Sequence, residues 1–171
     1  AALEILPSIK HFRPVDRLEI ATAIASRTLT HQPELMMTDT QVRRLHQAGI
    51  AIGGHTRNHP ILATVELDEA LSEIAGGKAD LEAIIGDEVT AFAYPNGRES
   101  ADFTLQHRDI LRRLGFSVAV TTEPFAASTE SDQFRLPRFT PWDHTPTRFL
   151  LRLLHAYTRT PSNREQSARD T

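Results

Sequence analysis

The residues with the clearest chemical potential are His55 and His59, which lie four positions apart in the segment Gly-Gly-His-Thr-Arg-Asn-His-Pro. In one helical turn this spacing would place both rings on the same side. Pro60 disfavours helical backbone at His59, so the turn has to end there. Imidazole nitrogens suit zinc, cobalt or nickel better than calcium or magnesium. The pattern indicates a pair of metal ligands; the alternative is two surface histidines beside a proline turn.

A second candidate segment is Phe-Ala-Tyr-Pro-Asn-Gly at residues 92–97. It follows an apolar run, and its Pro-Asn-Gly turn would expose backbone N–H groups near Asn96. Such groups can stabilise negative charge that develops on a substrate oxygen. The alternative is an ordinary turn without a chemical role.

A third candidate segment covers residues 136–146, where Leu-Pro-Arg-Phe is followed by Pro-Trp-Asp-His-Thr-Pro. Trp142 could offer a flat face to a sugar ring, and Arg138 or Asp143 could orient a catalytic group. Equally, the segment could be a loop between a strand and a helix, with Trp142 in the core and Asp143 or Thr145 as the helix cap.

Hydrophobic periodicity and cap residues predict alternating helices and strands. Thr38 and Gln41 form a capping-box pattern, and Gly76 and Gly77 predict a kink or a close packing partner inside their helix. Helices are expected over residues 15–28, 38–48, 68–85, 105–114 and from 146, and strands over 50–54, 89–93, 116–121 and 134–140.

The sequence also predicts which side chains of these helices are buried and which are exposed. In the last helix four apolar residues are expected to face the core, namely Phe149, Leu150, Leu153 and Leu154. Polar helix faces are expected for His46 and His107, and a half-buried position for His155.

Helix–strand alternation is typical of a mainly parallel sheet, either open and doubly wound or closed as a barrel. The carboxyl ends of parallel strands are where such folds place their sites. The chain contains no G-x-G-x-x-G and no phosphate-loop lysine motif, which argues against a nucleotide-binding version.

Composition narrows the class of protein. The 171 residues fit one domain, expected over residues 1–158 with a disordered tail at 159–171. A net charge of −3 with scattered basic residues argues against nucleic acid as partner. No apolar run is long enough to span a membrane. Cysteine is absent, which excludes disulfides and thiolate zinc sites.

The three segments occur in the order found in the polysaccharide deacetylases (the NodB-homology domain, carbohydrate esterase family 4). Residues 55–60 resemble that family's His-Ser/Thr-x-x-His-Pro motif, and residues 92–95 resemble its Phe-Ala-Tyr-Pro variant. Residues 36–38, 136–139 and 142–149 resemble the deacetylases of exosortase-linked exopolysaccharide gene clusters. The likeness covers about residues 5–155.

This resemblance implies a partial, distorted (β/α) barrel that hydrolyses N-acetyl groups on a hexosamine-containing polysaccharide. It implies Zn²⁺, or another divalent transition metal, held by His55, His59 and an aspartate. A backbone donor near Asn96 would face the reacting carbonyl. The substrate would lie against Tyr94, Pro95 and Trp142, with Tyr94 also a catalytic candidate.

Two departures from the family pattern shape the expectation for this chain. The family's Asp-Asp motif is absent, so the strand that carries it is expected upstream of Ala1. The arginine that orients the catalytic base is replaced by Ala93, and Arg138 is a candidate substitute. The general acid could be His144, His155 or neither.

We therefore expect an inactive or nearly inactive chain that binds metal weakly and self-associates through an open sheet edge. Two alternatives remain open. One is a non-catalytic carbohydrate-binding or scaffold domain, and the other is a metallohydrolase that takes its carboxylate from Asp102 or Asp143. The polymer, its linkage and the location (periplasmic, extracellular or cytoplasmic) are left open by the sequence.

Overall fold

The computed structural model describes residues 8–9, 12–27, 35–140 and 142–158. Its centre is a parallel pair of strands, β1 (Ala91–Ala93) and β2 (Val118–Val120), with Phe92 opposite Ala119. Single parallel bridges extend the pair on both sides, from Gly54 to Phe92 and from Val120 to Leu136. The four chain segments thus lie side by side in the order in which they occur along the chain.

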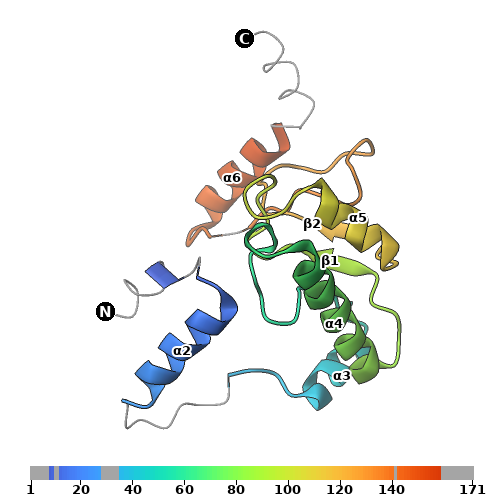
Figure 1. Cartoon of the computed structure of the whole chain (residues 1–171). Helices are drawn as coiled ribbons and strands as arrows, with labels where there is room; N and C mark the ends of the chain where they lie inside the picture. Colours follow the sequence, from blue (N-terminus) through green and yellow to red (C-terminus); the bar gives the residue numbers. More distant parts are fainter. Residues whose placement is uncertain (1–7, 10–11, 28–34, 141, 159–171) are drawn as a thin grey trace.

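Helices connect the first three of these segments (Figure 1). A short 3₁₀ helix (Leu62–Thr64) and α4 (Leu67–Ile85) join Gly54 to β1, and α5 (Leu105–Arg113) joins β1 to β2. Helix α3 (Asp39–Gln47) contacts α4, which in turn contacts α5. Helix–strand alternation with parallel pairing is therefore confirmed. Closure into a barrel is not seen among the described residues.

Local signals account for where these helices begin and end. Thr38 caps α3: its side chain accepts a hydrogen bond from the Gln41 amide, while the Gln41 side chain accepts one from the Thr38 amide. Helix α4 ends at Gly86, whose φ of 72° lies in the left-handed region that glycine adopts without strain. The start of α3 and the end of α4 lie within one or two residues of the positions expected from the sequence.

The core lies where α4 and α5 pack against the strands. Its side chains include a parallel stack of Tyr94 on Phe103, with ring centroids 3.7 Å apart. Phe92 meets both Tyr94 and Phe116 edge to face. The other buried members are aliphatic: Leu62, Ala70, Ile74, Val89, Ile110, Leu111 and Ala119.

Two outer helices expose most of their apolar side chains to solvent. Helix α2 (Pro14–Ala25) and helix α6 (Pro146–Thr158) lie at the periphery in Figure 1. The expectation that the apolar stripe of α6 faces inward is wrong, because Leu150 is 54% exposed and Leu154 is 53% exposed. Phe149, Leu153 and His155 are exposed as well. Only Ala156 of this helix is buried.

Two expected strands are reduced to single bridges. Of residues 50–54, only Gly54 makes ladder hydrogen bonds, with its amide on the Ala91 carbonyl at 2.8 Å and its carbonyl on the Ala93 amide at 2.9 Å. Glycines pack poorly into strands, and a Cβ on Gly54 would lie 3.2 Å from the Phe92 ring. Of residues 134–140, only Leu136 forms a bridge, because Pro137 has no N–H to continue the ladder.

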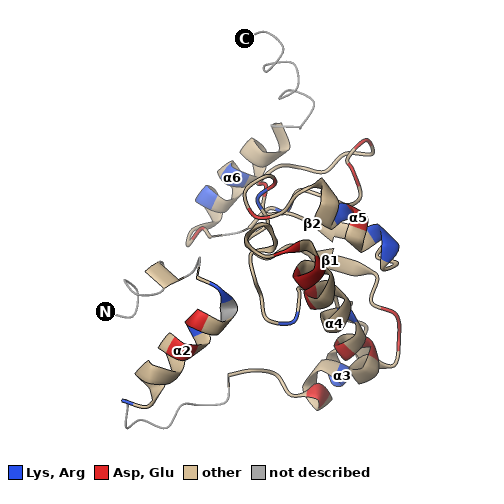
Figure 2. Cartoon of the chain, viewed as in Figure 1, with Lys and Arg blue, Asp and Glu red and all other residues tan. Residues whose placement is uncertain are grey.

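Charges of both signs are distributed over the helices (Figure 2). Helix α2 carries both signs, whereas the Lys and Arg positions of α6 have no acidic neighbour within the helix itself. No helix in the described ranges is both long and apolar enough to cross a membrane. The expected tail at 159–171 lies outside the described residues.

Candidate functional site

The candidate segments gather at the carboxyl end of the parallel segments. His55 directly follows Gly54, and the turn at Asn96 follows β1. Arg138 follows the bridge at Leu136 and donates its amide to the Glu123 carbonyl, just beyond β2. These residues lie close together because parallel pairing brings the carboxyl ends of neighbouring segments to one edge of the sheet.

His55 and His59 are adjacent in space. Their ring centroids lie 4.7 Å apart and the rings meet at 77°. Both residues are exposed. An ion about 2.0–2.1 Å from one nitrogen of each ring would be within reach of both. The geometry therefore permits the pair to bind one cation.

The His55 ring is oriented by a backbone carbonyl. Its Nδ1 lies 2.6 Å from the Ala93 oxygen. A carbonyl oxygen only accepts hydrogen bonds, so this contact places the proton on Nδ1 and leaves the Nε2 lone pair available. Metal-binding histidines are commonly held this way. A backbone acceptor leaves no signal in the sequence, so the role of the Ala93 carbonyl can be seen only in the structure.

The histidine loop is not the helical turn that the spacing suggests. Thr56 has φ 63° and His59 has φ 55°, both in the left-handed region. The Thr56 hydroxyl accepts a hydrogen bond from the His59 amide at 3.0 Å. On the other side, Arg17 of α2 donates to the His59 carbonyl at 3.4 Å. The two rings meet because of this turn.

The second candidate segment forms a tight turn at Asn96 and Gly97, with φ values of 58° and 80°. Thr122 fixes the turn to the end of β2: its hydroxyl donates to the Asn96 carbonyl at 2.6 Å, and its amide donates to the Gly97 carbonyl at 3.0 Å. The Gly97 amide donates to Pro95 and the Arg98 amide to Asp102. The backbone donor that the sequence suggests is therefore the Asn96 amide.

Asn96 has a second notable feature. Its side-chain nitrogen is buried and has no hydrogen-bond partner within the described structure. Buried donors without partners are uncommon and often occur at functional sites. Asn96 therefore brings two donor nitrogens to this edge of the sheet, the backbone amide and the buried side-chain amide.

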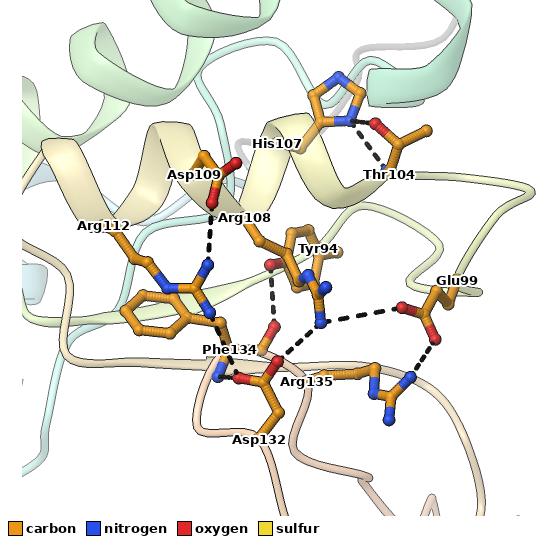
Figure 3. A network of polar contacts seen from close by, with 10 residues as sticks. All are labelled: Tyr94, Glu99, Thr104, His107, Arg108, Asp109, Arg112, Asp132, Phe134 and Arg135. Atoms are coloured by element: carbon orange, nitrogen blue, oxygen red, sulfur yellow. Dashed lines mark hydrogen bonds and ion pairs between the residues drawn. The ribbon is translucent and has the colours of Figure 1, made fainter. Parts of the chain in front are cut away.

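Tyr94 lies in the core of the protein. Its side chain is only 1% exposed, and burial raises the pKa of its hydroxyl far above the usual value. The hydroxyl donates to the Phe134 carbonyl at 2.9 Å. Figure 3 shows this contact inside a network of charged groups that joins α5 to residues 132–135. Pro95 is also buried. Neither side chain presents a free surface to a substrate, contrary to the expectation that both would contact one.

The third segment is partly exposed to solvent. Trp142 is 73% exposed, so the alternative that places it in the core is wrong. Asp143 accepts hydrogen bonds from two nitrogens of the Arg152 guanidinium, at 2.6 and 2.9 Å, and is thereby bound to α6. Arg138 and His144 are exposed. His107, expected on a polar face, is buried at 3% exposure.

The donors present fit part of a metal site. The imidazole rings of His55 and His59 lie next to each other, and the Ala93 carbonyl orients the His55 ring through its Nδ1. Imidazole nitrogens are ligands that zinc-type ions prefer. Within the described ranges, no group of three His, Cys, Asp or Glu side chains is close enough to hold a metal. Neither Asp102 nor Asp143 completes such a group there, so the alternative metallohydrolase gains no support.

Comparison with known proteins decides the family. A sequence model described as polysaccharide deacetylase matches residues 20–119, more than half of the chain. The chain belongs to the polysaccharide deacetylase family. The matched stretch includes both candidate metal ligands and Asn96.

Individual deacetylases agree with this. YxkH of Bacillus subtilis strain 168, provisionally named a polysaccharide deacetylase, is 31% identical over 102 residues, which are 60% of this chain and 35% of that protein. The Streptococcus pyogenes deacetylase PplD, solved in complex with acetate, is 27% identical with a TM-score of 0.61. That match covers 68% of this chain and 50% of PplD.

A more distant structure shares the deacetylase fold. IcaB from Ammonifex degensii is 23% identical with a TM-score of 0.54, covering 71% of this chain and 53% of IcaB. At this identity the likeness concerns the fold alone. The chain spans about half, or less, of the length of the relatives it matches.

Proposed function

We propose that this chain is part of a metal-dependent hydrolase that removes N-acetyl groups from a hexosamine-containing polysaccharide. The reaction breaks a carbon–nitrogen bond other than a peptide bond. The observation that carries the proposal is the adjacent pair His55 and His59, with His55 oriented by the Ala93 carbonyl. Membership of the deacetylase family supports it. PplD was solved with acetate, the product that removal of an acetyl group would release.

His55 and His59 would hold Zn²⁺ or a similar divalent transition ion. The family pattern adds an aspartate from outside the described residues, and without it we expect weak binding, since catalytic zinc sites normally have three protein ligands. When bound, such an ion lowers the pKa of a water ligand towards about 7. We expect the chain alone to be inactive or nearly so.

The remaining site residues would bind and orient the substrate. The Asn96 amide would donate to the acetyl oxygen, where negative charge develops as water adds to the carbonyl. Trp142 is exposed enough to stack on a sugar ring. Arg138 stays a candidate for orienting a catalytic group. The part of Tyr94 and Pro95 would be to hold the Asn96 turn in place from the core.

Titration of the chain with Co²⁺ and Zn²⁺ tests the metal site. We expect weak but saturable binding by the wild type, and its loss in His55→Ala and in His59→Ala. His46→Ala is the matched control, because His46 lies on α3 and its Nε2 is 3.5 Å from Asp87. Equal binding by all four proteins would contradict the proposal.

The exposure of Trp142 favours a second candidate, a carbohydrate-binding domain without catalysis. Titration with chitooligosaccharides in the presence of a chelator separates the two functions. Binding that persists in the chelator, is lost in Trp142→Ala and is unchanged in His55→Ala would favour the binding domain. Binding that depends on both the metal and His55 would favour the deacetylase.

A further inference from the structure

The loop between the two histidines is held by a carboxylate from α4. Glu73 accepts three hydrogen bonds from it. Its Oε2 receives the Arg57 amide at 3.1 Å and the Asn58 amide at 2.7 Å, and its Oε1 receives the Asn58 side-chain nitrogen at 2.6 Å. Hydrogen bonds to an ionised carboxylate are stronger than those between neutral groups. All three donors lie between His55 and His59.

A glycine pair in α4 lets the loop come this close. A Cβ on Gly77 would lie 2.9 Å from the Thr56 carbonyl carbon, and a Cβ on Gly76 would lie 2.7 Å from the Arg57 guanidinium carbon. At Gly77 a side chain would meet backbone atoms and cannot fit, and at Gly76 it would displace the Arg57 guanidinium. Gly76 and Gly77 therefore form a notch in the helix, and the packing partner expected from the sequence is the histidine loop itself.

Arg57 adds a second anchor beside the notch. Its guanidinium binds Asp80 through two nitrogens, at 2.7 and 2.8 Å, and reaches the Gly76 carbonyl at 3.3 Å. The Asp80 contact fixes the side chain of Arg57, whereas the Glu73 contacts fix the backbone next to it. Only the backbone contacts act directly on the turn that joins the two rings.

The turn needs such support because its backbone is unfavourable. Thr56 and His59 both have positive φ, which non-glycine residues adopt rarely and keep only where their surroundings enforce it. Removing the acceptor for the Arg57 and Asn58 amides would leave only the side chain of Arg57, bound to Asp80 and the Gly76 carbonyl, to connect the turn to α4 by hydrogen bonds. His55 would stay on the Ala93 carbonyl while His59 moved away.

We infer that Glu73 is a positioning residue, which holds the 55–59 turn against the Gly76–Gly77 notch so that His55 and His59 stay together. The effect of Glu73 on metal binding rests on the proposed function. Its effect on the distance between the two rings does not depend on that function. Glu73 would touch neither the metal nor the substrate. Loss of a group that orients metal ligands typically weakens metal affinity by about 10–100-fold.

The test uses Glu73→Gln and Glu73→Ala in the whole chain, with Glu69→Gln on the same helix as the matched control. In the metal-free protein, NMR contacts between the ring protons of His55 and His59 report their proximity. We expect strong contacts in the wild type and in Glu69→Gln, and their loss in both Glu73 variants. Asp80→Asn, which frees only the Arg57 side chain, should retain them.

Titration with Co²⁺ gives the second readout. We expect about tenfold or greater weakening in the Glu73 variants and less than about twofold in Glu69→Gln. Folded Glu73 variants that keep the ring contacts would overturn the inference. Loss of the fold in both would overturn it too, because Glu73 would then determine folding and not loop geometry. If the wild type binds no Co²⁺, the proposed metal site fails, and the ring contacts alone decide the role of Glu73.

Discussion

The central unit of β1, β2, α4 and α5 and the two outer helices all contain apolar residues but differ in how far these residues are buried. In the centre, Phe103 and Leu111 are fully buried and Ile74 is 1% exposed. On the outer helices, Leu18 of α2 is 66% exposed and Leu150 of α6 is 54% exposed. An apolar stripe thus locates the face of a helix that can be buried, but another surface has to cover it. Only the central helices have that surface among the described residues.

The two regions also differ in their ion pairs. In the centre, Arg108 binds Asp132 at 2.6 Å with side chains 13% and 29% exposed, and Asp132 also accepts the Phe134 amide at 2.8 Å (Figure 3). On the N-terminal side of α2, Arg13 binds Asp16 with side chains 75% and 39% exposed. Water competes with the second pair far more than with the first.

The largest expected difference between the regions concerns apolar truncation. Phe103→Ala should lower the free energy of unfolding by about 3–5 kcal/mol, because it removes a buried ring stacked on Tyr94. Leu150→Ala on α6 should change it by less than about 0.5 kcal/mol. Urea unfolding of both variants measures the contrast. Similar losses in the two would mean that α6 is covered in solution.

A smaller contrast is expected for the ion pairs. Asp132→Ala should cost about 1–3 kcal/mol, since it leaves the poorly exposed Arg108 guanidinium and the Phe134 amide without this acceptor. Arg13→Ala should have no measurable effect on stability, because its pair with Asp16 is exposed. Urea midpoints at low and high salt test this. A salt-sensitive loss in Arg13→Ala, with none in Asp132→Ala, would reverse the comparison.

The smallest effect near neutral pH is expected from His107 in the centre. Burial lowers the pKa of this imidazole below its ordinary value of 6.5, and the nearby Leu62 backbone offsets part of the shift. The unfolded chain therefore takes up the proton first as the pH falls. The stabilising contribution is complete above about pH 6.5 and declines between that pH and the lowered pKa.

His107→Gln tests this dependence while keeping an acceptor for the Thr104 amide, which lies 2.9 Å from the imidazole Nδ1. Unfolding free energies at pH 7.5 and pH 5 should fall more for the wild type than for His107→Gln. Equal slopes in the two proteins would show that His107 does not titrate differently on folding.

Several helix ends could be predicted from local signals. The capping box at Thr38 and the glycine at 86 act through their own neighbours in the chain, so the sequence contains the whole interaction. The histidine pair is predictable for the same reason, since the two residues are only four positions apart in the chain. The geometry of the pair is not predictable in this way, because the left-handed turn at Thr56 lies beside contacts with α4, among them those of Glu73 with the next two amides.

Contacts between distant segments explain the failures as well. His107 has a polar side chain on an exposed-looking helix, but α5 packs on the core at that position. The strand expected at 50–54 needs partners along its length, and only Gly54 has one. The apolar residues of α6 suggested an inward face, although the surface that would cover them is not formed by the described residues.

The order of the parallel segments has a consequence for how the site holds together. Each segment pairs only with its immediate neighbours in the chain, from Gly54 through β1 and β2 to Leu136. Among the described residues, Asn96 follows an inner segment flanked on both sides, whereas His55 follows an outer one that is paired by a single bridge. The Asn96 turn is therefore held by the strands on both sides, whereas the histidine loop depends in addition on its hydrogen bonds to Glu73 of α4.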